Sequence, residues 1–196
     1  MENSKQPKLG PQILKNGLIW GAINIVIFLV AWYTMPEALG ETWYQLISIV
    51  IGILLAVYFC KDLRTHAGGY WSFSQALWPI FGMFILSAGI LFTFNIIFGK
   101  YIDTTYPVKM KEMVMERSLA MYEKFGMDES MIEKSMMAVE ESIDAQVSPT
   151  VPQAIKGFGI VAIIYFIGAL IFAAIFKRSD PNPWKEELEA ENNPQV

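Results

Sequence analysis

The sequence is poor in charged residues and in the side chains that most enzymes use for chemistry. Only 17% of its 196 residues are charged, against roughly 25% in an ordinary soluble domain. It has a single cysteine, Cys60, and a single histidine, His66. This excludes a disulfide within the chain, and no second histidine or cysteine is left to complete a catalytic triad or a zinc site. We therefore expect neither a cofactor nor a bound metal, and no enzymatic activity.

A strong excess of charge of one sign is also missing. The formal net charge is -4, and the sequence has no basic stripe that could follow a phosphate backbone. We therefore expect no nucleic-acid partner.

Hydrophobic residues make up 54% of the chain, and many of them gather in four runs without a charged side chain. The runs cover residues 17–35, 43–60, 80–98 and 157–176. Each is close to the roughly 20 residues that a helix needs to cross the hydrocarbon core of a bilayer. Because backbone amides in hydrocarbon must be satisfied within their own segment, the runs are predicted to be helices despite their many isoleucines and phenylalanines. The predicted fold class is all-α, a four-helix polytopic membrane protein.

The first run resembles a signal peptide in having lysines before it. It is longer than the roughly 7 to 15 apolar residues of a signal peptide, and it does not end at an A-x-A-like cleavage site. We therefore expect it to stay in the protein as an uncleaved signal anchor.

Lysine and arginine near the helix ends predict the orientation in the membrane. Three flanks are basic, and their cations are Lys5, Lys8, Lys15, Lys61, Arg64, Lys177 and Arg178. The connection 36–41 has two glutamates and no cation. Both termini and the connection 61–69 are therefore placed in the cytoplasm, and 36–41 outside. The predicted organisation is a cytoplasmic N-terminal segment (1–16), membrane helices 1–3 (17–98), an external segment (99–156), membrane helix 4 (157–176) and a cytoplasmic disordered tail (177–196).

The external segment 99–156 is predicted to form an amphipathic helical hairpin between helices 3 and 4. In its first half, apolar residues from Met110 to Phe125 recur near one helical face, and Gly126 stands where a C-terminal cap is expected. The second half opens with an S-x-x-E capping box, Ser130 and Glu133, and two prolines follow it. The hairpin can pack on itself, on the membrane surface or on a partner, and the sequence leaves all three open.

The hairpin contains eight methionines. Thioether sulfur is a soft ligand for Cu(I), but no histidine or cysteine in the segment supports a metal site. Methionine also fills irregular apolar interfaces. We interpret these residues as packing or as an adaptable contact surface, and the hairpin carboxylates as its solvated face.

The stretch "GGYWSFSQALWPIF" at residues 68–81 is predicted to begin the third helix. Ser72 and Gln75 form an S-x-x-Q capping box, so the helix should start near Phe73. Pro79 cannot donate to the carbonyl of Gln75, and a kink is expected there. The amphipathic aromatic residues of the stretch are predicted to lie at headgroup depth in the membrane interface: Tyr70, Trp71 and Trp78.

The same stretch carries a resemblance to a known family. A short charged loop, "GGYWSFSQAL", an apolar helix, "YID" at 101–103, an acidic amphipathic segment and a final helix together resemble the bacterial membrane-protein family called domain of unknown function 4199, over roughly residues 17–177. The resemblance implies four helices in a bacterial inner membrane. Family members often have proline after the aspartate, where this chain has Thr104. No activity is established for the family, so the resemblance implies no catalytic or ligand-binding residue.

The four runs hold no ionisable acid, base or histidine, which disfavours a proton- or ion-coupled transporter. Four polar residues are candidates for hydrogen bonds between helices or for the lining of a small cavity: Asn24, Ser87, Thr93 and Asn95. The favoured function is a non-enzymatic membrane component that contacts lipids and a protein partner or a second copy of itself, through the hairpin or the helices. The alternative is a small oligomeric channel or transport accessory, lined by the four polar residues. A membrane enzyme acting on a lipid-linked substrate is the third hypothesis.

Overall fold

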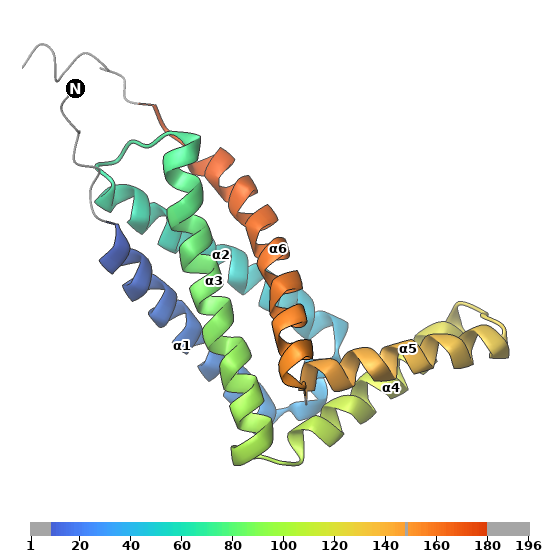
Figure 1. The fold of residues 1–196 in the computed structure, drawn as a ribbon. Helices are drawn as coiled ribbons and strands as arrows, with labels where there is room; N and C mark the ends of the chain where they lie inside the picture. The colour runs from blue at the N-terminus through green and yellow to red at the C-terminus, as the bar shows by residue number, and fades with distance from the viewer. Residues whose placement is uncertain (1–8, 148, 180–196) are drawn as a thin grey trace, which may run out of the picture.

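The computed structural model describes residues 9–147 and 149–179, and nearly all of these lie in helices (Figure 1). The α-helices of this part are α1 (Gly10–Thr34), α2 (Thr42–His66), α3 (Phe73–Ile97), α4 (Tyr106–Lys124), α5 (Glu129–Val147) and α6 (Val151–Phe176). A short 3₁₀ helix, η1 (Pro36–Gly40), joins α1 to α2, and a π-helical turn, η2 (Phe98–Ile102), extends α3. The all-α prediction is confirmed. The predicted disordered tail lies outside the described residues from residue 180 onward.

Four helices are long and apolar enough to cross a membrane, namely α1, α2, α3 together with η2, and α6. All four begin or end beyond the apolar runs. α1 begins at Gly10, α2 continues to His66 and α6 begins at Val151. Residues 10–16 and 61–66, expected in a terminal segment and a loop, are therefore helical. An apolar run shows only the part of a helix that is suited to the hydrocarbon core of the membrane. The helix itself continues beyond that part until a cap or a turn ends it.

α3 lies between α1 and α6 in the bundle (Figure 1). Against α1 the contact is very close at two glycines. A Cβ atom added at Gly17 would lie 2.6 Å from the side chain of Leu86, and one at Gly21 would lie 2.9 Å from that of Ile90. Small residues at this spacing let two helix backbones approach each other in a membrane. The contacts run from the start of α1 toward its end, so α1 and α3 are parallel neighbours.

α2 packs on the other helices mainly through its second half. Ala56, Phe59, Cys60 and Leu63 are buried in the larger hydrophobic cluster of the bundle. Its first half carries exposed apolar residues, from Leu46 to Leu54. In Figure 1, α2 crosses behind α3 rather than running alongside it. The exposed half is suited to hydrocarbon, since its side chains are apolar and its backbone is satisfied within the helix.

A second hydrophobic cluster lies where the hairpin meets the bundle. Its buried members are Trp32 of α1, Phe98 of η2, Tyr106 of α4 and Ile143 of α5. The rings of Trp32 and Tyr106 meet edge to face with centroids 5.2 Å apart, and those of Phe98 and Tyr106 with centroids 5.5 Å apart. Such aromatic pairs stabilise the fold beyond the contribution that comes from burying their apolar surface. The base of the hairpin is therefore part of the core.

α4 and α5 are packed against each other and project to one side of the bundle (Figure 1). Gly126 is in the turn between them with φ of +67°, a left-handed value that suits glycine. α5, however, begins at Glu129, and the N–H groups of Met131 and Ile132 both donate to the carbonyl of Asp128. The predicted capping box at Ser130 and Glu133 is therefore wrong, because Asp128, which also favours the N-cap position, begins the helix two residues earlier.

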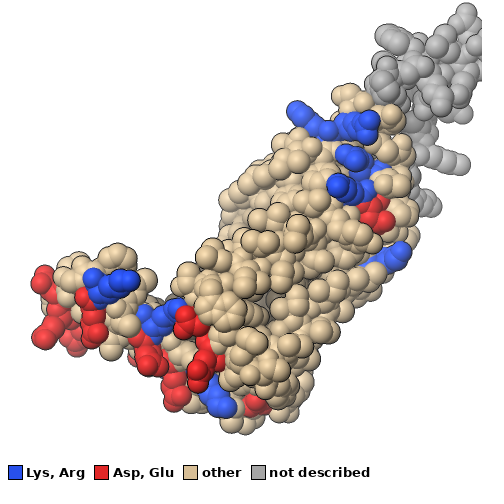
Figure 2. All heavy atoms as spheres, turned by 180° about the vertical axis from the view of Figure 1, so that it is seen from behind, with Lys and Arg blue, Asp and Glu red and all other residues tan. Residues whose placement is uncertain are grey.

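Charged side chains lie mainly at two places on the molecule (Figure 2). The end where α1 begins and α6 ends carries lysines and arginines with few acids, and we call it the basic end. The hairpin carries most of the acidic side chains, and lysines and arginines lie among them (Figure 2). α5 alone carries five acids and one lysine. The excess of cations at the basic end agrees with the charge distribution from which we predicted the orientation, and the orientation stays a prediction.

Candidate functional site

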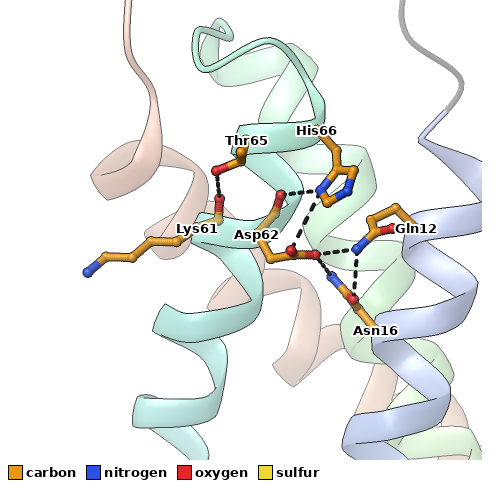
Figure 3. Close-up of polar contacts among 6 residues, drawn as sticks. All are labelled: Gln12, Asn16, Lys61, Asp62, Thr65 and His66. Carbon is orange, nitrogen blue, oxygen red and sulfur yellow. Dashed lines mark hydrogen bonds and ion pairs between the residues drawn. The ribbon is translucent and has the colours of Figure 1, made fainter.

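Four polar side chains meet at the basic end, between the start of α1 and the last turns of α2 (Figure 3). Nδ2 of Asn16 donates to Oδ2 of Asp62 at 2.8 Å, and Nε2 of Gln12 donates to the same oxygen. Nε2 of Gln12 also donates to Oδ1 of Asn16 at 3.2 Å. On the other side, Nδ1 of His66 lies 2.9 Å from the main-chain oxygen of Asp62 and 3.6 Å from its Oδ1. Asn16 is 2% exposed. We call these four residues the Asp62 cluster.

The Asp62 cluster is built to hold one carboxylate. Its two amide groups donate N–H groups to the carboxylate, whereas Nδ1 of His66 is within hydrogen-bond distance only of the main-chain oxygen of Asp62. Because Gln12 and Asn16 come from α1 and Asp62 from α2, the cluster links two helices that pack on each other sparsely elsewhere. Among residues 9–147 and 149–179, no group of three histidine, cysteine, aspartate or glutamate side chains is placed to hold a metal ion. We assign the cluster to helix positioning.

Sequence reasoning missed this cluster. It treated Asp62 and His66 as part of a solvated loop and did not single out Gln12 or Asn16. The signal that was available is their spacing: each pair is four residues apart, which puts its members on one face of a helix. The missing step was to continue both helices beyond their apolar runs.

A second polar group fixes the base of the hairpin. Nε1 of Trp32 donates to Oδ2 of Asp103 at 2.8 Å. The other oxygen, Oδ1, accepts from the hydroxyl of Thr105 at 2.6 Å and from its N–H at 3.0 Å. The hydrogen bonds from Thr105 and from Trp32 lower the pKa of Asp103 below its ordinary value. Both carboxylate oxygens are therefore occupied in orienting the chain where it leaves α3 and enters α4.

Ion pairs hold the two arms of the hairpin to the bundle and to each other. Nη2 of Arg117 in α4 lies 2.9 Å from a carboxylate oxygen of Glu41, which follows η1. Nζ of Lys111 lies 2.8 Å from Glu140 and 3.0 Å from Asp144, both in α5. The hydrogen bonds to these two carboxylates raise the pKa of Lys111. The hairpin thus packs on itself and on the first connection.

The predicted capping box at the start of α3 is present. Oγ of Ser72 accepts from the N–H of Gln75 at 3.3 Å, and Oε1 of Gln75 accepts from the N–H of Ser72 at 2.8 Å. α3 begins at Phe73, as expected. The helix continues through Pro79, so residues 73–79 and the apolar run after them form one element. The kink at Pro79 stays a prediction.

The three aromatic residues predicted at the membrane interface differ in their surroundings. Trp71 is 3% exposed, and its Nε1 donates to the main-chain oxygen of Phe176 at 2.8 Å. Trp78 is 62% exposed, and Tyr70 is half-buried with the guanidinium carbon of Arg178 5.3 Å from its ring centroid. Trp71 is therefore largely buried against the end of α6, whereas most of the Trp78 side chain is exposed. Headgroup depth stays a prediction for all three.

The connection before α3 is tied to the end of α6 by its backbone. The N–H of Trp71 donates to the oxygen of Arg178, and the N–H of Arg178 donates back to the oxygen of Trp71, each at 3.0 Å. Gly68 and Gly69 make the turn that allows this, with φ of +93° and +86°. These are left-handed values that residues with a Cβ atom rarely adopt. Gly68 and Gly69 thus position Trp71.

The four polar residues predicted to contact one another or line a cavity in the membrane helices differ in burial. Ser87 is buried, Asn24 and Asn95 are half-buried, and Thr93 is exposed. Because Ser87 and Thr93 are six residues apart on α3, they point to different sides of the helix. Oδ1 of Asn95 is buried without a hydrogen-bond partner among the described residues. Ser87 and Thr93 therefore do not face one lining, and a path lined by all four residues stays a prediction.

Four membrane-spanning helices and a helical hairpin before the last one define a small polytopic membrane protein. Its family is shown by sequence comparison. The family model described as "Protein of unknown function (DUF4199)" matches residues 15–178. The protein belongs to this family, as the resemblance based on the stretch 68–81 and the segments after it indicated. No curated protein and no solved structure matches the chain.

Proposed function

We propose that this protein is a non-enzymatic membrane component that contacts a partner protein through the α4–α5 hairpin. The observation that carries the proposal is the contrast between the two ends of the hairpin. Its base is anchored in the core and by ion pairs. Its free end, around the turn at Gly126, presents large apolar side chains.

The free end is defined by Met121 and Phe125 at the end of α4 and by Met131 at the start of α5. All three side chains are exposed, and Phe125 is 75% exposed. Single exposed apolar residues are common, but a group at the end of a projecting arm marks an interaction site. Methionine is well suited to such a surface because its flexible thioether side chain adapts to the shape of a partner.

The charge of the hairpin favours a protein partner over the membrane surface. Amphipathic helices that lie on membranes are typically rich in lysine and arginine on their polar face, which attracts anionic lipids. α5 has the opposite character, with five acids and one lysine. Such a helix is repelled by anionic headgroups and attracted by a basic protein surface.

The channel hypothesis has less support. Its lining was expected to consist of Asn24, Ser87, Thr93 and Asn95, and these side chains differ in burial and in the side of the helix they occupy. A helix-packing role accounts for Ser87, which is 1% exposed.

The proposal is tested by placing a photo-crosslinking amino acid at position 125 in the full-length protein in cells. The matched control places it at Ile164 of α6, which is also well exposed but lies within the candidate span. We expect position 125 to form an adduct with a specific protein and position 164 to react with lipid. The captured protein is then purified and titrated against the wild type and the F125D and M131D variants.

We expect both variants to bind the captured protein at least tenfold more weakly, since each places a carboxylate in an apolar contact. Their melting temperature in detergent should match that of the wild type, because neither residue belongs to the core. Adducts at position 125 with lipid alone, or unchanged binding by F125D, would contradict the proposal. An adduct of twice the chain mass would indicate a homo-oligomer instead.

A further inference from the structure

We propose that the basic end of the bundle holds a binding site for the headgroup of an anionic phospholipid, in a groove beside the start of α3. This inference is independent of the function proposed for the hairpin. The groove has a volume of about 450 Å³ and is lined mostly by residues of the stretch 68–81, together with Leu9 and Ala67. The volume lies in the range of small-molecule sites, roughly 300 to 1,000 Å³.

The walls of the groove are aromatic and differ in their exposure. Tyr70, Trp71 and Trp78 all line it. Trp71 is held in place by its bonds to Phe176 and Arg178, whereas Trp78 projects outward. A rigid inner wall and an exposed outer ring suit a ligand that lies half in the protein and half in the interface. Indole and phenol rings are favoured at headgroup depth in a membrane.

The groove also offers polar groups of both kinds. Ser74 and Gln75 line it. Oε1 of Gln75 is used in the capping box, so the side chain can offer its NH₂ group to a ligand as a donor. Pro79 cannot donate to the main-chain oxygen of Gln75, which can therefore accept from a headgroup hydroxyl. Donors for a phosphate and an acceptor for a hydroxyl are the set that a phosphatidylglycerol headgroup requires.

The sign of the ligand charge is indicated by the cation next to the groove. The guanidinium of Arg178 lies over the ring of Tyr70, and the backbone pairing with Trp71 keeps it there. The surrounding end of the molecule is rich in lysine and arginine (Figure 2). A basic residue near an anionic leaflet is attracted to its headgroups, and a groove of defined shape next to that residue can select one kind of headgroup.

The test is the melting temperature of the full-length protein in a mild detergent with added lipid. Phosphatidylglycerol, phosphatidylcholine and glycerol 3-phosphate are compared for the wild type and for the S74F, R178Q and K177Q variants. S74F fills the groove without touching the capping box. R178Q removes the cation and leaves the backbone pairing intact. K177Q is the matched control, since it removes a neighbouring charge that does not lie over Tyr70.

We expect phosphatidylglycerol to raise the melting temperature of the wild type and of K177Q by about 5 °C, and the other two compounds to have little effect. S74F and R178Q should lose most of the shift while retaining a lipid-free melting temperature close to that of the wild type. Equal shifts with phosphatidylglycerol and phosphatidylcholine would overturn the proposal. So would an undiminished shift in R178Q, even if S74F fails to fold, or a full response to glycerol 3-phosphate, which would indicate a site for a soluble phosphate.

Discussion

The indole of Trp32 in α1 donates a hydrogen bond of 2.8 Å to the carboxylate of Asp103, which follows η2. The two residues are 71 positions apart in the sequence. Asp103 also accepts two hydrogen bonds from Thr105. This arrangement sets the direction in which the hairpin leaves the bundle, and it does so beside the buried aromatic cluster at the hairpin base.

Replacing Asp103 with asparagine should loosen the base of the hairpin. In the D103N variant one carboxylate oxygen becomes an NH₂ group, which must face either the N–H of Trp32 or the donors of Thr105. Both are donors, so one hydrogen bond is lost whichever way the amide turns. We expect faster cleavage of the hairpin in limited proteolysis. The D128N variant, at the hairpin turn, is the control and should be cleaved like the wild type.

Acidification should loosen the same contact only at low pH. Because its hydrogen bonds lower the pKa of Asp103, the carboxylate stabilises the folded state above the unfolded pKa of about 3.9. That stabilisation is lost as the pH falls through the lower pKa of the folded state. We expect a step in tryptophan fluorescence below about pH 4 in the wild type and a smaller step in D103N. Identical acid titrations of the two proteins would contradict this assignment.

The ion pair between Arg117 and Glu41 should contribute little to the stability of the protein as a whole. Both side chains are well exposed, and such pairs typically couple by about 0.2 to 1 kcal/mol. A double-mutant cycle with R117Q and E41Q should give a coupling within this range, and it should fall as salt is added. E37Q, on the same connection, serves as the uncoupled control. A coupling of several kcal/mol would show that the pair is more desolvated than its exposure indicates.

Gly21 should tolerate alanine much less well than Gly52. A Cβ atom at Gly21 would lie 2.9 Å from Cβ of Ile90, whereas one at Gly52 would meet nothing within 4 Å. We expect G21A to destabilise the protein by about 1 to 3 kcal/mol, measured as a lower melting temperature in detergent. G52A should be neutral or stabilising by up to about 1 kcal/mol, because alanine is the better helix former. Equal effects of the two substitutions would mean that α1 and α3 do not pack closely at Gly21.

Trp71 should be needed for stability where Trp78 is not. The W71F variant keeps an aromatic ring but loses the indole N–H, which leaves the main-chain oxygen of Phe176 without that donor. An unsatisfied buried acceptor costs about 1 to 3 kcal/mol, so we expect a clear fall in melting temperature. W78F is the control, because Trp78 is exposed and its substitution should change stability by less than about 0.5 kcal/mol. A W71F protein as stable as the wild type would exclude this role.

The membrane helices and some of the signals at their ends could be predicted from the sequence alone. In the hydrocarbon core of a membrane, an uncharged apolar run must form a helix, because a helix satisfies its own backbone hydrogen bonds. The four membrane helices could therefore be located from the composition of the sequence alone. The capping box at Ser72 and Gln75 was also predictable, since its bonds span three residues. The same kind of reasoning failed at Ser130, because Asp128 offers an equally good cap nearby.

The contacts between residues far apart in the sequence could not be predicted, because they depend on how the helices pack. Asn16 reaches Asp62, Trp32 reaches Asp103 and Trp71 reaches Phe176 only because the helices pack at a particular depth and rotation. That packing depends on shape complementarity along whole helix faces, such as the fit of Gly17 and Gly21 against α3. A local sequence pattern predicts a helix and shows which of its residues are polar. It does not show which face of a neighbouring helix lies opposite, and that face supplies the partner of each polar group.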